Sequence, residues 1–256
     1  MFTNIAFENK IKHNSPLLFF QWCILVIMGH NNQTTEFNTT VIAIAGASAS
    51  GKTLFADTIY KELVEENALS EREIAFISED SYYKDLSHMN MEERVKVNYD
   101  HPDAFEHQLM IEHINQLKSG NPIELPIYSY TEHTRTDKTR TIQPSRIVLI
   151  EGIMLLTDPD LRKQFDIQVF MDTPLDICLI RRIGRDMQER GRTFDSIINQ
   201  YEATVRPMYF EFIERCRQLA DIVVTKGGKN RAAIDIIKAK IKQLIVGGNL
   251  PSNYKS

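Results

Sequence analysis

The clearest chemistry in the 256-residue chain lies in eight consecutive residues, Gly46, Ala47, Ser48, Ala49, Ser50, Gly51, Lys52 and Thr53. They match the phosphate-binding loop GxxxxGK(S/T) at every fixed position. Gly46 and Gly51 permit backbone conformations in which consecutive N–H groups point at phosphate oxygens. Lys52 adds a positive charge near the β- and γ-phosphates, and Thr53 offers a hydroxyl to Mg²⁺. The loop therefore predicts binding of a nucleoside triphosphate, but it does not identify the group that receives the phosphate.

Two carboxylates follow apolar runs that we expect to be strands of one sheet. Asp80 comes soon after 74–77, and Glu151 directly follows 147–150. Ligands of open α/β sheets bind beyond the carboxyl ends of the strands, so both side chains are expected near the phosphate loop. Asp80 could accept a proton from an attacking hydroxyl or help to hold Mg²⁺, and it could equally cap a helix. Glu151 could hold Mg²⁺, directly or through water, or orient Thr53 or Asp80.

A dense run of arginines lies in a segment that begins at 172–174, where we expect a helix to start: Arg181, Arg182, Arg185, Arg190 and Arg192. A charge run is usually a solvated helix face, and Asp186 and Glu189 support that interpretation. Phosphoryl transfer, however, needs cations around the transferring group, and arginine supplies them in a fixed fork geometry. Gly184 and Gly191 interrupt the run, as expected of a movable lid.

The elements that must position these residues can be read from short apolar runs. Strands are expected at 41–45, 74–77, 147–150, 167–171 and 220–225, with helices over 54–64 and after the last strand to about 244. Runs that are apolar throughout are typical of parallel strands buried on both faces. Extended segments at 125–130 and 139–142 predict a β-hairpin inserted into this core. The expected fold is therefore α/β, with a P-loop NTPase-type parallel sheet flanked by helices, a β-hairpin insertion and an arginine-rich lid.

Composition is that of an ordinary soluble enzyme. Lys and Arg number 30 against 34 Asp and Glu, and 43% of residues are hydrophobic, which excludes collagen-like, low-complexity and mostly disordered chains. Because no block of Lys and Arg is present, we expect no nucleic-acid partner. The cysteines, Cys23, Cys178 and Cys216, lack CxxC spacing. This favours free thiols in a reducing, cytoplasmic compartment over disulfides or a zinc site.

The first 39 residues are expected to lie outside the main domain. Residues 15–29 form an apolar run preceded by Lys10 and Lys12, as in a secretory signal, but no small-x-small cleavage site follows. The run is also short of the roughly 20 apolar residues that a membrane span needs. We therefore expect a disordered extension over 1–39, or a true start at Met28, rather than a membrane anchor, then a domain over 40–247 and a flexible tail over 248–256.

Six segments in order resemble the uridine kinase family of P-loop nucleoside kinases, and specifically its bacterial form: GASASGKT, EDSYYKDLSHMNMEERVKVNYDHPDAF, LPIYSYTEHTR, IEGIMLL, VFMDTPLDICLIRRIGRDMQERGR and YFEFIERCRQLADIVVTKGGKNRAAIDI. The resemblance covers 40–244. It implies transfer of the γ-phosphoryl group of ATP or GTP, with Mg²⁺, to the 5′-hydroxyl of uridine or cytidine, giving UMP or CMP in pyrimidine salvage. It also implies a homotetramer with CTP as a feedback inhibitor.

The resemblance further implies roles for the catalytic groups. Asp80 is similar to the general base of the family, and Arg185 is similar to a lid residue that contacts phosphate. With Lys52, these two residues form the expected catalytic set. The metal ligands expected from the side-chain chemistry described above are Thr53, Asp80 and Glu151.

Nine residues are similar to the nucleoside-binding residues of the family: Tyr83, Tyr99, Asp100, Tyr128, Tyr130, His133, Arg182, Arg192 and Gln200. The family likeness implies that Asp100 accepts hydrogen bonds from the ribose hydroxyls, which would favour ribonucleosides. A helix cap near His101 is the alternative role for Asp100. Tyr128 and Tyr130 would stack on the pyrimidine. Because a neutral imidazole has one donor and one acceptor, His133 suits both uracil and cytosine.

Two other kinds of protein share the phosphate loop. One is a related P-loop kinase of the phosphoribulokinase or pantothenate kinase type, and the hairpin aromatics argue against it because they suit a flat base. The other is a nucleotide-binding switch or regulatory ATPase. No NKxD guanine-reading motif follows a late strand, which weakens a GTPase version. Dependence of nucleotide turnover on uridine discriminates among these hypotheses.

Overall fold

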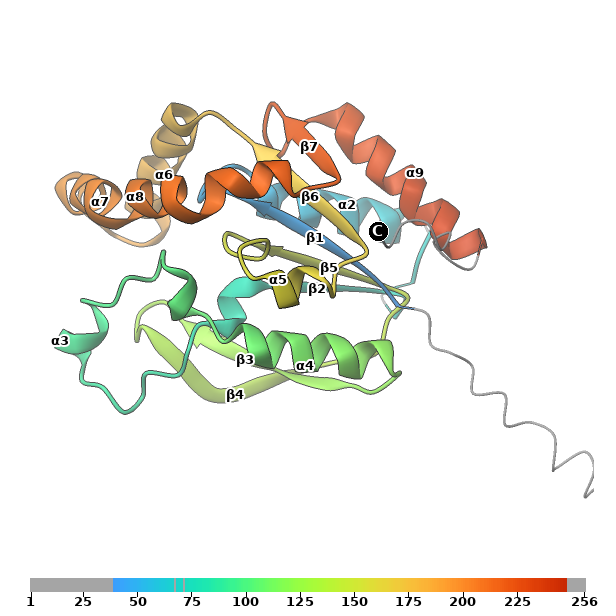
Figure 1. Cartoon of the computed structure of the whole chain (residues 1–256), viewed down its shortest axis with the longest axis horizontal. Coiled ribbons are helices and arrows are strands. Elements are labelled where there is room, and N and C mark those ends of the chain that lie inside the picture. Colours follow the sequence, from blue (N-terminus) through green and yellow to red (C-terminus); the bar gives the residue numbers. More distant parts are fainter. Residues whose placement is uncertain (1–38, 67, 71, 248–256) are drawn as a thin grey trace, which may run out of the picture. The chain divides into compact units, whose positions relative to one another are not determined.

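The computed structural model describes residues 39–66, 68–70 and 72–247. The expected extension, apart from Thr39, and the expected tail therefore lie outside the described residues, as does Cys23. Five parallel strands form the main sheet, in the order β2-β5-β1-β6-β7 (Figure 1). Their bounds are Thr40–Gly46 for β1, Ile74–Ser78 for β2, Ile147–Gly152 for β5, Ile167–Asp172 for β6 and Ile222–Thr225 for β7. The expected α/β fold and its five strands are confirmed, although β7 begins two residues later than expected.

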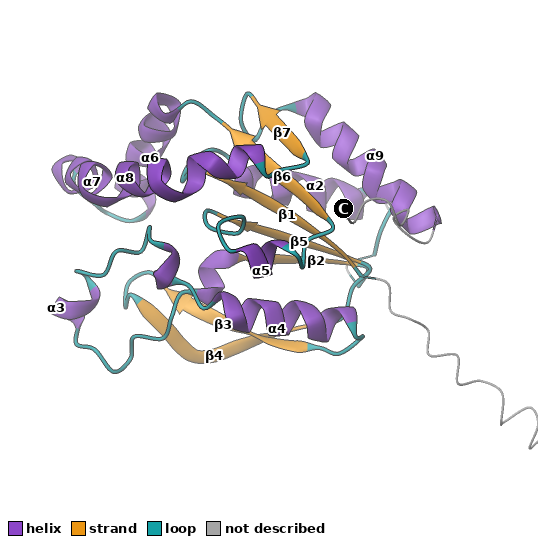
Figure 2. Ribbon diagram, in the orientation of Figure 1, coloured by secondary structure: helices purple, strands orange, loops and turns teal. Residues whose placement is uncertain are grey.

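Both faces of this sheet are buried, as the apolar runs predicted. In β1, Val41, Ala43 and Ala45 face one apolar cluster, while Ile42 and Ile44 face the other. Helices α2 (Lys52–Glu65) and α9 (Arg231–Gly247) cover the second face. The first face packs on α4 (His107–Lys118), α5 (Pro159–Arg162) and the hairpin, on the opposite side of the sheet (Figure 2). The core thus fixes β1 from both sides, and with it the loop that β1 carries.

The register of the strands aligns their carboxyl ends. Glu151 in β5 pairs with Ile44 of β1 on one side and with Ser78 of β2 on the other. Gly46 at the end of β1 pairs with Met171 of β6. The chain leaves β1 toward β2 on one side and returns to β6 on the other, and such a switch point is where ligands bind in open α/β sheets.

The expected hairpin forms a separate antiparallel pair of strands, β3 (Ile123–Ser129) and β4 (Thr134–Ile142). Strand β4 begins five residues before the expected 139. The sequence did not indicate this early start, because six consecutive residues of β4, from Thr136 to Thr141, are exposed and polar. They therefore show no alternation of apolar and polar residues.

The arginine-rich segment is helical. Helix α6 (Leu175–Glu189) is followed by α7 (Phe194–Gln200) and by a continuous run of short helices, namely η3 (Tyr201–Val205), α8 (Arg206–Met208), η4 (Tyr209–Ile213) and η5 (Glu214–Gln218). Short helices elsewhere are η1 (Glu79–Tyr82), α3 (Met91–Arg94) and η2 (Pro102–Ala104). No helix in the described part of the chain is long and apolar enough to cross a bilayer. Cys178 and Cys216 are free and buried, as expected.

Candidate active site

The phosphate loop joins β1 to α2 and packs against the loop that precedes α9. Gly51 has φ 100°, a left-handed value that favours glycine. A Cβ on Gly51 would lie 2.6 Å from the backbone nitrogen of Gly228, so no other residue fits there without a shift. Lys52, the first residue of α2, is only 9% exposed. The loop expected from the sequence is therefore packed closely against the loop before α9, and its lysine is buried.

Lys52 and Glu151 face each other beside the loop. Lys52 Nζ lies 4.0 Å from Glu151 Oε2, and the Ser78 hydroxyl donates to Glu151 Oε1 at 2.8 Å. Burial raises the pKa of Glu151, and the charge of Lys52 opposes this shift. The nearby charge of Asp80 raises the pKa of Glu151 further. The structure therefore brings together the ends of β1, β2 and β5, as their sequence positions predicted.

Asp80 lies in the first turn of η1 and is half-buried. Ser78 holds the N-cap position of that helix, so the alternative prediction that Asp80 caps a helix is wrong. The Tyr130 hydroxyl donates to Asp80 Oδ2, which links the hairpin to the end of β2. Arg190 covers the same tyrosine, with its guanidinium carbon 4.8 Å from the ring centroid. Tyr130, which we expected to stack on a base, thus contacts the expected general base.

A cluster of aromatic side chains packs together near η1 and the hairpin. The Tyr83 ring stacks on Phe105 at a centroid distance of 4.3 Å and lies 4.8 Å from Tyr128. The Tyr99 ring stacks on His133 at 5.5 Å, and its hydroxyl donates to the His133 backbone oxygen at 3.2 Å. Burial, followed by nearby arginine charges, lowers the pKa of His133 and favours a neutral imidazole. The four residues expected here, Tyr83, Tyr99, Tyr128 and His133, therefore do come together.

Asp100 lies across from the phosphate loop, in a pocket that Ser48 and Arg182 also line. It is 8% exposed, and the Thr204 hydroxyl donates to its Oδ2 at 3.2 Å. Burial raises the pKa of Asp100, and the charge of Arg182 opposes the shift. The alternative that Asp100 caps a helix is wrong, because His101 is the N-cap of η2 and accepts from the Asp103 backbone nitrogen.

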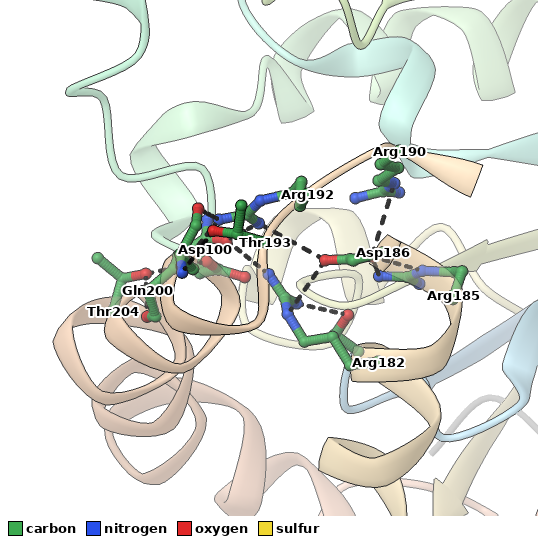
Figure 3. A network of polar contacts seen from close by, with 11 residues as sticks. Asp100, Arg182, Arg185, Asp186, Arg190, Arg192, Thr193, Gln200 and Thr204 are labelled. Atoms are coloured by element: carbon green, nitrogen blue, oxygen red, sulfur yellow. Dashed lines mark hydrogen bonds and ion pairs between the residues drawn. The ribbon is translucent and has the colours of Figure 1, made fainter. Parts of the chain in front are cut away.

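An arginine connects this pocket to the phosphate loop, and Figure 3 shows Arg182, Arg192 and Gln200 close together beside Asp100. Arg182 donates from Nη1 to the Ser48 hydroxyl at 2.9 Å and from Nη2 to Gln200 Oε1 at 3.0 Å. Arg192 donates to the same Gln200 oxygen. The expected nucleoside residues Arg182, Arg192 and Gln200 are thus one hydrogen-bonded unit, and it includes a residue of the phosphate loop.

Sequence reasoning missed the residue at the centre of these arginines. Asp186 has no exposed surface and forms ion pairs with Arg182, Arg185, Arg190 and Arg192. The interpretation of Asp186 as part of a solvated face is therefore wrong. The spacing of Arg182, Asp186 and Arg190 at four-residue steps was the available signal. Gly184 lies within α6 and does not interrupt it, whereas Gly191 follows the helix end with φ 61°.

Comparison with known proteins places this geometry in a family context. The family model described as "Phosphoribulokinase / Uridine kinase family" matches residues 41–233. The chain is 57% identical to the uridine kinase of Vibrio atlanticus over 218 residues, which cover 85% of this chain and 99% of that protein. It is 59% identical to the uridine kinase of Cronobacter sakazakii, over 79% of this chain and 94% of that one. The D-glycerate 3-kinase of Cryptococcus neoformans shares the fold, with a TM-score of 0.53 at 18% identity, covering 79% of this chain and 90% of that one.

Proposed function

The chain belongs to the phosphoribulokinase/uridine kinase family, and we propose that it transfers the γ-phosphoryl group of ATP or GTP to the 5′-hydroxyl of uridine or cytidine, giving UMP or CMP. The observation that carries the proposal is the 57% identity to a uridine kinase over 99% of that protein's length. The geometry supports it, because a carboxylate and a buried lysine face each other beside the phosphate loop, and Asp80 lines a cavity together with Tyr128 and Tyr130. This enzyme would serve pyrimidine salvage.

Asp80 is the general base in this proposal. A base must lie within hydrogen-bond reach of the proton that it accepts. The Tyr130 hydroxyl already donates to Asp80 Oδ2, so this oxygen is accessible to a hydroxyl donor from the hairpin side. The 5′-hydroxyl would take the place of that donor. Lys52 and Arg185 would stabilise the negative charge that spreads over the transferring phosphoryl group.

The acceptor nucleoside would lie between the hairpin and the arginine-linked pocket. Tyr128 would contact a flat base, with the buried Tyr83 packed beside its ring. A neutral His133 can pair with the O4 of uracil or the N4 of cytosine. Asp100 would accept the ribose hydroxyls, with Arg182 beside it. Arg192 and Gln200 would close the pocket, and this arrangement supports use of both pyrimidine nucleosides.

Mg²⁺ is the cofactor that the family membership implies, and the side chains fit it. Among the described residues, no three His, Cys, Asp or Glu side chains converge as a metal cage. Mg²⁺ is usually held by one or two carboxylates, a hydroxyl and substrate phosphates, so the donor set Thr53, Asp80 and Glu151 is suitable. Bound there, Mg²⁺ would neutralise charge developing on the phosphate oxygens.

The proposal extends to the setting of the enzyme. We propose a cytoplasmic homotetramer that CTP inhibits. Burial raises the pKa of the Cys178 and Cys216 thiols to about 11 each, which keeps them unreactive and agrees with a reducing compartment. Light scattering of the purified chain would test the tetramer, and titration with CTP would test the inhibition.

A substrate panel with a matched pair of variants tests the proposed reaction. Phosphorylation of uridine, cytidine, thymidine, adenosine and pantothenate is measured with Mg-ATP on the wild type, Asp80→Asn and Asp137→Asn. We expect turnover of uridine and cytidine alone, an Asp80→Asn loss of about 100-fold or more, and no loss in Asp137→Asn, an exposed hairpin carboxylate. Uridine-independent ATP hydrolysis, or full activity without Asp80, would overturn the proposal.

A further inference from the structure

One buried carboxylate holds the arginines of the lid segment together (Figure 3). Asp186 Oδ1 lies 2.8 Å from Arg185 Nη2 and 3.7 Å from Arg190 Nε. Its Oδ2 lies 3.5 Å from Arg192 Nη1 and 3.7 Å from Arg182 Nε. Asp186 is completely buried, whereas Glu189, on the same helix, is exposed. Asp186 is therefore the shared partner of all these cations.

Three of the four arginines, Arg182, Arg190 and Arg192, also contact other parts of the site. Arg182 donates to the Ser48 hydroxyl in the phosphate loop and, like Arg192, to Gln200 of α7. Arg190 covers the Tyr130 ring, and the Tyr130 hydroxyl donates to Asp80. One arginine side chain therefore links Asp186 to each of three places: the phosphate loop, α7, and Tyr130 beside the proposed base.

Like charges at this density repel one another unless an anion lies among them. One carboxylate does not balance the four guanidinium groups around it, although Asp100 is a second anion near Arg182. Removal of the Asp186 charge would leave the buried Arg182 with less compensation and would increase the repulsion among the four guanidinium groups. Arg182 is only 5% exposed, so water can solvate little of its guanidinium charge. The arrangement of the arginines therefore depends on Asp186.

The cluster also retains unused hydrogen-bonding capacity. Neither Asp186 Oδ2 nor Arg182 Nε has a hydrogen-bond partner within the described residues, although the two atoms face each other at 3.7 Å. Buried polar atoms are rarely left without partners. A shift of less than about 1 Å would bring this pair into hydrogen-bond range. Arg182 and Asp186 both lie on α6, so a small side-chain rotation can tighten the contact between them.

We propose that Asp186 is a positioning residue that sets Arg182 and Arg192 toward the acceptor pocket, Arg190 over Tyr130 beside the proposed base, and Arg185 toward the reacting phosphoryl group. It touches neither substrate, and it acts through the arginines. The assignment of the two substrates rests on the proposed function, whereas the links from Asp186 to Ser48, Gln200 and Tyr130 rest on geometry alone.

Kinetics of Asp186→Asn test the proposal, with Glu189→Gln as the matched control on α6. Asn keeps the size of the side chain and removes its charge. We expect kcat/KM for uridine to fall about 100-fold, with a lower kcat as well as a higher KM, because small displacements of positioning groups have effects of this size. Glu189→Gln should stay within about twofold of the wild type.

Further measurements distinguish a positioning role of Asp186 from a role in the stability of the fold alone. Asp186→Glu keeps the charge and displaces it, so it should recover activity partly relative to Asp186→Asn, by about tenfold. Melting temperatures are measured on every variant. If Asp186→Asn does not fold, the proposal is tested with Asp186→Glu alone, and we expect its kcat to be lower than that of the wild type. Lower stability with unchanged kcat and KM, or full activity in both variants, would overturn the proposal.

The test also distinguishes this inference from the proposed function. If the wild type does not phosphorylate uridine, the proposed function fails, and the inference is then tested by titrating a fluorescent ADP analogue. Arg182 contacts the phosphate loop, so Asp186→Asn should weaken nucleotide binding by about tenfold relative to the wild type and Glu189→Gln. Equal affinities in the three proteins would overturn the inference.

Discussion

Adjacent carboxylates, Glu79 and Asp80, have opposite environments at the end of β2. Glu79 is completely buried, accepts from the Met154 backbone nitrogen at 2.8 Å and lies 3.0 Å from His107 Nε2. Asp80 is half-buried and faces Tyr130. The partners of Glu79 hold the turn in place, and Asp80 is left to meet a substrate hydroxyl. One carboxylate is therefore structural, and the next is suited to act as a base.

Asp100→Asn tests the ribose contact at this scale. An amide side chain replaces one acceptor oxygen with a donor, so a ribose hydroxyl loses its charged partner. We expect KM for uridine to rise roughly 10- to 100-fold, the size expected for one hydrogen bond to a charged group. The preference for uridine over 2′-deoxyuridine should shrink in parallel. Asp103→Asn, at a side chain that is 88% exposed, is the control, and an unchanged preference in Asp100→Asn would refute the role.

At the scale of elements, the phosphate loop is held by α2 and by the loop before α9. The Gly51 backbone approaches Gly228 so closely that a Cβ on either glycine would clash with the other residue. Close backbone approach of this kind fixes the loop without any side chain. At Gly184, in α6, a Cβ would lie in open space, so the packing there does not require a glycine.

Gly51→Ala and Gly184→Ala form a matched pair of predictions. At Gly51, with φ 100° and a clash at 2.6 Å, alanine should lower the free energy of unfolding by at least about 1 kcal/mol and abolish nucleotide binding. At Gly184 alanine should raise the free energy of unfolding by about 0.5–1 kcal/mol, because glycine is unfavourable within a helix. Thermal unfolding and nucleotide titration measure both effects. A large loss of kcat in Gly184→Ala would instead support the expectation of a flexible lid at that residue.

At the scale of the whole domain, α9 near the end of the described chain is fastened to α2 near its start. Arg231 and Lys238 of α9 both bond Glu62 of α2, at distances from 2.5 to 2.7 Å. Lys238 also bonds Glu66. Both helices pack on the same face of the sheet, so these ion pairs lie over a shared apolar contact. The carboxylates that they involve make stability depend on pH.

Glu62→Gln should flatten the acid unfolding profile. The hydrogen bonds from Arg231, followed by that from Lys238, lower the pKa of Glu62 to about 2, from an ordinary value of 4.5. Between these two pKa values the unfolded chain therefore binds more protons than the folded chain. The stabilisation that ionised Glu62 contributes is present above pH 4.5 and is lost as the pH falls toward 2. The wild type and Glu62→Gln should differ most above pH 5 and converge near pH 2. Since the pair is partly exposed, 1 M salt should reduce the difference, and Glu65→Gln, at an exposed site on α2, should show none.

The sequence by itself determined the phosphate loop, the parallel strands and the position of Asp80 and Glu151 at one edge of the sheet. These features follow from local pattern, because continuous apolar runs bury both faces of a strand and the loop needs its residues at fixed spacing. The start of β4 escaped detection because its polar residues face solvent and leave no periodic signal.

Only the tertiary structure decided the partners of the charged side chains. Asp186 has an arginine four residues away on either side. This spacing is the same whether the carboxylate faces water or lies in a buried cluster, so the sequence does not distinguish the two. Its burial depends on how α6 packs over the phosphate loop. Likewise, Tyr130 meets Asp80 only because the hairpin folds over the end of β2, 50 residues earlier in the chain. Contacts over such separations depend on packing, which no local pattern in the sequence records.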